Sequence, residues 1–318
     1  MRMLQLPVAA CALTLAIFAG CGGSGKPAAN APTSSAGSAS APAAALSPAD
    51  AGEGPRLTLS QDNVHLEYRV YGHGEPAVML VHGWAADANY WYAQIQPLKA
   101  RYTVVALNLA GHGGSESNRT DWSIANYAQD VAAIAHEIPN TRIVLVGHGM
   151  GALVSLAAAP LLGQRLVGII AVDALRSAGL PPLPPREVAS RIAPFQADFV
   201  GTTRNYVTDS LFPKDANALL VQKVAYDMSL EPPAIGVASM QQLLSIDTAP
   251  VLAQIHVPVY AINSDLEATD AARIRRSLPQ FTLDVLPHTG HFLMMEAPAR
   301  FNPVLLKDLD ALAQLPAH

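Results

Sequence analysis

The residues Ile143-Val144-Leu145-Val146-Gly147-His148-Gly149-Met150-Gly151 decide the fold of this chain. The first four are continuously apolar, as in a strand that is buried on both faces of a parallel sheet. Glycines then alternate with larger residues, and they allow the chain to turn tightly and to bring a strand close to the helix that follows it. Residues 151–162 are mostly apolar and fit that helix. The stretch predicts a strand, a sharp turn and a helix in direct succession.

Seven more segments have strand character, and helical segments separate several of them. The predicted strands are Arg56–Leu59, His65–Tyr71, Ala77–Val81, Thr103–Asn108, Ile143–Val146, Val167–Val172, Val257–Ile262 and Thr282–Leu286; the clearest helices are Trp122–Glu137, Gly151–Leu162 and Asp270–Leu278. This alternation predicts an α/β fold with a mostly parallel eight-stranded sheet and helices on both of its faces. The early strands around His65–Tyr71 follow each other through turn-length segments, so we expect them to pair antiparallel.

The interval between Val172 and Val257 is too long for a simple connection. It holds about 84 residues, with a proline cluster from Pro181 to Pro185 and then helix-compatible segments. A structureless loop of this length is unusual in a compact domain. We therefore expect a helical lid over about residues 174–256.

The N-terminal part has the composition of a leader and a tether. In residues 1–20, Arg2 supplies a positive charge before an apolar run. The run is shorter than the roughly 20 residues of a membrane-spanning helix, and this pattern is typical of a secretory signal peptide. The leader ends in Phe18-Ala19-Gly20-Cys21, which resembles the bacterial lipobox, in which the cysteine receives a lipid. Residues 22–55 are nearly all Ala, Ser, Gly and Pro and predict a disordered tether. We expect a lipoprotein that is anchored through Cys21 to a membrane of the bacterial cell envelope, facing the periplasm or the exterior, with the globular domain at 56–318.

Composition excludes several classes of function. The net charge of −5 is mild, and no cluster of basic residues suggests a nucleic-acid partner. The two cysteines, Cys11 and Cys21, lie in or directly after the leader, so the domain has neither a disulfide nor a metal site built on cysteine. We expect no cofactor.

Four motifs resemble the α/β-hydrolase family. Gly147-His148-Gly149-Met150-Gly151 resembles the nucleophile elbow, whose common form is Gly-His-Ser-Met-Gly. Val81-His82-Gly83-Trp84 and Asn108-Leu109-Ala110-Gly111-His112-Gly113-Gly114-Ser115 resemble two conserved loops, and Gly290-His291-Phe292 resembles the loop of the catalytic histidine. They occur in the family's order across residues 57–316, and the chain is identified as a member on that conjunction.

The resemblance assigns roles to individual residues, but the nucleophile is absent. Gly149 stands at the serine position and has no side-chain atom, so we do not expect an acyl-enzyme. His291 has the position of the general base. The backbone amides of Trp84 and Met150 have the positions of the oxyanion hole.

The carboxylate partner of His291 stays open between three residues. Counting from the strand that ends at Ile262 places the acid at Glu267, with Asp265 as the near alternative. Some members of the family place it after the preceding strand, where Asp173 lies. We favour Glu267 or Asp265 over Asp173.

Other nucleophiles and a metal site are poorer explanations. Ser155 faces the packed side of the predicted helix, and nothing in the sequence requires Ser245 or Ser264 to approach the elbow. His82, His112 and His148 belong to backbone motifs of the fold, so we expect no metal cluster.

Two functions remain open for this chain. The first is an enzyme of ester or amide hydrolase lineage, acting on a small and fairly apolar molecule, in which His291 activates water or performs another proton transfer. The second is an inactive protein that binds a small-molecule ligand or a partner on the same fold. A recent or engineered exchange of serine for glycine is a third explanation of Gly149.

Overall fold

The computed structural model describes residues 53–315, and its centre is an eight-stranded sheet. The strand order is β1-β2-β4-β3-β5-β6-β7-β8. The strands are β1 (Arg56–Leu59), β2 (His65–Tyr71), β3 (Ala77–Val81), β4 (Thr103–Leu107), β5 (Ile143–His148), β6 (Leu166–Val172), β7 (Val259–Ser264) and β8 (Phe281–Leu286). β2 pairs antiparallel with β1 and β4, and all other neighbours are parallel, as the sequence predicts.

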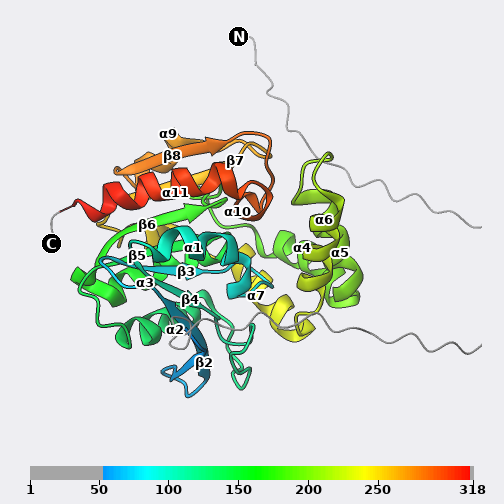
Figure 1. Cartoon of the computed structure of the whole chain (residues 1–318). Helices are drawn as coiled ribbons and strands as arrows, with labels where there is room; N and C mark the ends of the chain where they lie inside the picture. Colours follow the sequence, from blue (N-terminus) through cyan, green and yellow to red (C-terminus); the bar gives the residue numbers. More distant parts are fainter. Residues whose placement is uncertain (1–52, 316–318) are drawn as a thin grey trace, which may run out of the picture. The chain divides into compact units, whose positions relative to one another are not determined.

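Helices connect these strands and cover the sheet. They are η2 (Ala88–Trp91), α1 (Tyr92–Lys99), α2 (Ile124–His136), α3 (Met150–Leu162), η3 (Gly163–Arg165), α4 (Pro185–Ala197), α5 (Phe199–Ser210), α6 (Ala218–Ser229), α7 (Pro233–Ser245), α8 (Ala249–Leu252), α9 (Ala271–Ser277), α10 (Leu293–Glu296) and α11 (Pro298–Ala313). α1 and α11 lie together on one face of the sheet, and α2 and α3 lie together on the other (Figure 1). None of the helices in the described range is long and apolar enough to cross a bilayer.

The core explains why these segments become strands. Every residue of β3, β4, β5 and β6 is buried, because both faces of the central sheet are covered by helices. All eight predicted strands are present, and their ends differ from the prediction by at most two residues. The predicted α/β class, with its mostly parallel sheet, is confirmed.

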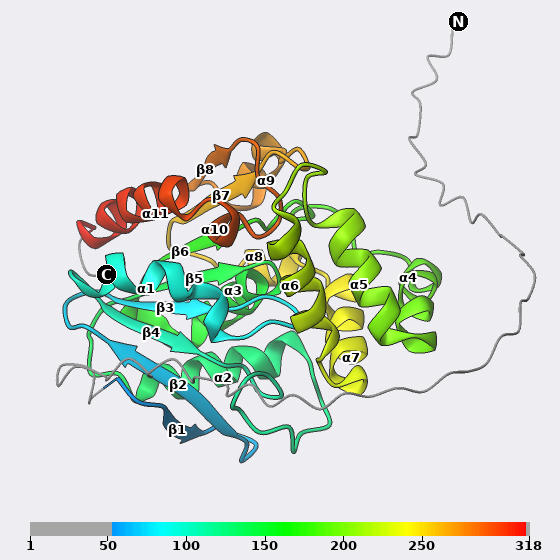
Figure 2. The same ribbon diagram turned by 45° about the vertical axis from the view of Figure 1, so that its right-hand side comes forward.

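The segment between β6 and β7 contains the five helices α4 to α8. Figures 1 and 2 place α4 to α7 beside the carboxyl ends of the central strands. Trp84, in the loop after β3, fastens this insertion to the sheet: its indole Nε1 donates a hydrogen bond of 2.8 Å to the carbonyl of Gly236 in α7. The Trp84 ring also packs edge-on against Phe195 and Phe199. The insertion is therefore part of the packed domain.

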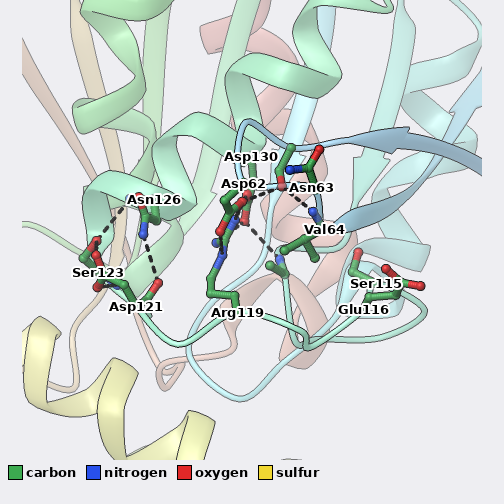
Figure 3. A network of polar contacts seen from close by, with 12 residues as sticks. Asp62, Asn63, Val64, Ser115, Glu116, Arg119, Asp121, Ser123, Asn126 and Asp130 are labelled. Atoms are coloured by element: carbon green, nitrogen blue, oxygen red, sulfur yellow. Dashed lines mark hydrogen bonds and ion pairs between the residues drawn. The ribbon is translucent and has the colours of Figure 1, made fainter.

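An ion network around the buried side chains of Arg119 and Asp130 holds the long loop between β4 and α2 (Figure 3). Arg119 donates to Asp130 of α2 at 2.6 and 2.9 Å and to Asp62 at two points, both 2.8 Å. Asp130 also accepts a hydrogen bond of 3.1 Å from the amide of Ala110. The network thereby fixes the loop on which the second conserved motif lies.

The predicted signal peptide and Cys21, the predicted lipidation site, lie outside the described residues. So does nearly all of the predicted tether.

Candidate active site

Gly149 forms a strained turn between β5 and α3. Its backbone has φ +51° and ψ −114°, a conformation that residues with a side chain rarely adopt. The flanking glycines are required by close packing, because a Cβ on Gly147 would lie 2.3 Å from the carbonyl oxygen of Gly151. A Cβ on Gly151 would lie 2.4 Å from the carbonyl oxygen of His82. This is the geometry of a nucleophile elbow, without its nucleophile.

His291 lies directly above Gly149. A Cβ on Gly149 would be 3.1 Å from Nε2 and 3.2 Å from Cε1 of His291, and apart from the two neighbours of Gly149 in the chain no other described atom lies within 4 Å of that point. In the described part of the chain, Nε2 makes no hydrogen bond. The basic nitrogen therefore faces the open space that a serine side chain would fill.

The carboxylate partner of His291 is Asp173. Nδ1 of His291 lies 2.7 Å from Oδ2 of Asp173, which follows β6 directly and is buried. The carboxylate of Glu267 is exposed and 4.0 Å from Arg176, and that of Asp265 accepts a 3.5 Å hydrogen bond from the amide of Thr289. The preference for Glu267 or Asp265 was therefore wrong.

The position of Asp173 has a clear physical reason. β6 and β7 are parallel neighbours, so residues that follow either strand reach the same edge of the sheet. β7 continues to Ser264, two residues beyond its predicted end, and the loop that follows turns Glu267 toward solvent. Burial alone would raise the pKa of Asp173, but the hydrogen bonds from His291 and Arg176 hold it well below its usual range.

His148 supports the backbone of His291. Its Nε2 lies 2.9 Å from the carbonyl oxygen of His291, and the two rings lie 4.3 Å apart between centroids. Burial, together with the neighbouring His291, lowers the pKa of His148 to about 3. A neutral imidazole that donates through Nε2 fits this contact. His148 is a structural support for the site.

His82 and His112 are also buried, and their ring nitrogens contact backbone groups. Nε2 of His82 accepts from the amide of Leu109, and its Nδ1 contacts the carbonyl of Gly83. Nδ1 of His112 lies 3.0 Å from the carbonyl of Ala110. Within residues 53–315, no group of three or more potential ligand residues could hold a metal ion.

The two oxyanion positions lie at the same cavity as Gly149 and His291. Met150 is the first residue of α3, so its amide has no acceptor within the helix. Trp84 lies in the loop after β3, and its indole is fixed by Gly236.

The cavity has a volume of about 390 Å³ and is mostly apolar. Besides the site residues, α3 and the insertion contribute most of its lining: Leu153, Leu175, Leu211, Met228, Met240, Leu243 and Leu244. The cavity is also lined by four residues that no sequence motif marks: Arg176, Ser177, Tyr206 and Ser210.

The serines named from the sequence do not replace the missing nucleophile. Ser155 is buried in α3 and donates to the carbonyl of Gly151. The Ser245 hydroxyl donates a hydrogen bond to the carbonyl of Gln242 at the end of α7. The Ser264 hydroxyl accepts a hydrogen bond from Nη2 of Arg176.

Comparison with known proteins agrees with this geometry. Residues 78–304 match the alpha/beta hydrolase family. An uncharacterized protein of Mycobacterium tuberculosis is 27% identical over 276 residues, covering 76% of this chain and 77% of that protein. A 2-(acetamidomethylene)succinate hydrolase of Mesorhizobium japonicum is 24% identical over 262 residues, covering 78% and 92%. Among solved structures, a thermophilic esterase from Thermogutta terrifontis superposes with a TM-score of 0.72 at 21% identity, covering 82% of this chain and all of that one. With the elbow, the histidine and the carboxylate in their places, the chain belongs to the alpha/beta hydrolase family.

Proposed function

We propose that this protein hydrolyses an ester or amide of a small, fairly apolar molecule with a water activated by His291, without an acyl-enzyme. One observation carries the proposal: Nε2 of His291 faces the open space beside Gly149, while its Nδ1 is hydrogen-bonded to Asp173. A neutral imidazole that is oriented in this way acts as a general base. The apolar cavity supports a substrate of matching character.

The reaction proceeds in two steps. The water oxygen forms a bond to the carbonyl carbon while Nε2 of His291 takes its proton, and the amides of Trp84 and Met150 stabilise the oxyanion. The tetrahedral intermediate then breaks its bond to the leaving oxygen or nitrogen, which receives the proton from Nε2. Asp173 stabilises the imidazolium in between. The products are a carboxylic acid and an alcohol or amine, and Gly149 forms no bond.

A panel of short p-nitrophenyl esters tests this function. We expect slow turnover without an initial burst, because no acyl-enzyme accumulates. His291→Ala and Asp173→Asn should each reduce the rate strongly and leave only the residual contribution of the oxyanion amides and of binding, whereas the control Glu267→Gln should retain the rate. Equal rates for the wild type and His291→Ala would contradict the proposal.

The second candidate is a binding protein that uses the same cavity. It is favoured by the glycine itself, which relieves the backbone strain that serine would bear and supplies no reacting atom. Titration calorimetry with the intact esters and their hydrolysis products distinguishes the two functions. Binding of an intact ester that is never hydrolysed would select the binding protein.

We also propose, from the sequence of the leader, that the protein is a lipoprotein of the bacterial cell envelope. The lipobox-like ending at Cys21 and the tether composition of residues 22–55 support this. Cys21→Ser should move the protein from the membrane to the soluble fraction. Unchanged partitioning of the variant, with no lipid on the wild type by mass spectrometry, would refute the anchor.

A further inference from the structure

Arg176 forms two hydrogen bonds to Asp173, the carboxylate that is hydrogen-bonded to His291. Its Nη1 donates to Oδ2 of Asp173 at 3.0 Å, and its Nη2 donates to Oδ1 at 2.8 Å. Oδ2 also accepts the 2.7 Å hydrogen bond from His291. The guanidinium and the imidazole therefore share one oxygen of the same carboxylate. Such a two-point contact fixes both the position and the plane of a carboxylate.

The loop after β7 fixes both members of this pair. The amide of Ser264 donates to Oδ1 of Asp173 at 2.7 Å, and the oxygens of Ser264 accept from Nη2 of Arg176 at 3.2 and 3.3 Å. Nε of Arg176 donates to the carbonyl of Glu267 at 3.1 Å. Few rotamers of either side chain are compatible with all of these contacts.

The backbone of this turn is strained and tied down. Asp173 has φ +45° and Leu175 has φ +65°, although neither is glycine. Strain of this kind persists where the surroundings determine the conformation. Here the Asn263 side chain accepts a hydrogen bond from the amide of Ala174 and donates one to its carbonyl. Arg273 donates a hydrogen bond to the carbonyl of Arg176.

Arg176 and His291 share the negative charge of Asp173. Because Oδ2 accepts a hydrogen bond from both side chains, part of the charge that the imidazole meets is already paired with the guanidinium.

We propose that Arg176 is a positioning residue: its two-point contact holds Asp173 toward His291 and sets the strength of the hydrogen bond between Asp173 and His291. The inference rests on the proposed function for its kinetic consequence. Its structural consequence can be tested without any substrate.

Kinetics of Arg176→Gln give the first test. We expect kcat to fall roughly tenfold, the scale observed when an outer hydrogen-bond partner is removed, with KM within about twofold. Arg176→Lys should also leave kcat reduced, because lysine retains the charge without the two-point contact.

Arg101→Gln is the matched control. Arg101 makes a similar two-point contact with Asp310 on the exposed surface, at 3.0 and 2.7 Å. Its loss should leave kcat and KM unchanged.

Proton NMR of the Nδ1–H of His291 gives the second test, which requires no turnover. We expect this resonance to move further downfield in Arg176→Gln, where Asp173 becomes the stronger acceptor, and to disappear in Asp173→Asn. If no ester is hydrolysed, the proposed function is refuted, but the spectrum still tests whether Arg176 positions Asp173 toward His291. If Arg176→Gln does not fold, Arg176→Lys should give a smaller shift and a reduced kcat. Spectra of Arg176→Gln or Arg176→Lys that match that of Arg101→Gln would overturn the inference.

Discussion

Replacing Gly149 by serine measures how far this site has departed from a serine hydrolase. At φ +51° and ψ −114°, a side chain costs about 1–3 kcal/mol of unfolding free energy. The new Cβ would lie 3.1 Å from Nε2 of His291, closer than ordinary van der Waals contact. The imidazole must move by a few tenths of an ångström, against its 2.7 Å hydrogen bond to Asp173, which costs about 1 kcal/mol more. We expect a total destabilisation of about 2–4 kcal/mol.

Gly163→Ser is the matched control for the backbone part. Gly163 ends α3 with φ +53° and ψ −133°, and nothing lies within 4 Å of where its Cβ would be. Its substitution should cost only the backbone term of about 1–3 kcal/mol. The difference between the two variants in urea denaturation therefore isolates the contact with His291.

Labelling with a fluorophosphonate is the functional assay. The wild type should not be labelled, and Gly149→Ser should be labelled at residue 149 and should hydrolyse p-nitrophenyl esters with a burst. His291→Ala in that background should abolish both. A folded Gly149→Ser variant that stays unlabelled would refute the inference that His291 and the amides of Trp84 and Met150 are arranged for acyl transfer. Stoichiometric labelling of the wild type would show that another serine is the nucleophile.

Three further predictions address the carboxylates and the insertion. Asp173→Asn should strongly reduce ester hydrolysis while Glu267→Gln leaves it within about twofold, because only Asp173 touches His291; equal losses in steady-state assays would contradict this. Burial raises the pKa of Glu231, which lies 3.3 Å from His112, to about 8, so the folded state keeps a proton that the unfolded chain loses above about 4.5. The contribution of Glu231 to stability should therefore fall as the pH rises between these values, and urea denaturation of Glu231→Gln should show a flatter dependence. Trp84→Phe removes the hydrogen bond to the insertion and should lower stability by about 1–2 kcal/mol; an unchanged midpoint would show that ring packing alone holds it.

The sheet could be predicted from sequence because its central strands are buried on both faces. Such strands are continuously apolar, and Val78-Met79-Leu80-Val81 and Ile143-Val144-Leu145-Val146 stand out from their surroundings. The position of Gly149 was predictable because close packing requires glycine on both sides of it. The ends of the strands were less certain, since hydrogen bonding rather than polarity determines where pairing stops.

The acid could not be predicted, because two carboxylate-bearing loops leave adjacent parallel strands at the same edge of the sheet. Spacing along the chain does not say which loop turns inward. Contacts across the loops decide it: Ser264 and Glu267 offer backbone groups that hold Asp173 and Arg176 in place. The loop after β7 therefore contributes to the site through its contacts with Asp173, the carboxylate that is hydrogen-bonded to His291. A sequence motif can thus mark a loop correctly and still assign the carboxylate to the wrong residue, because this loop acts mainly through backbone groups that hold Asp173 and Arg176.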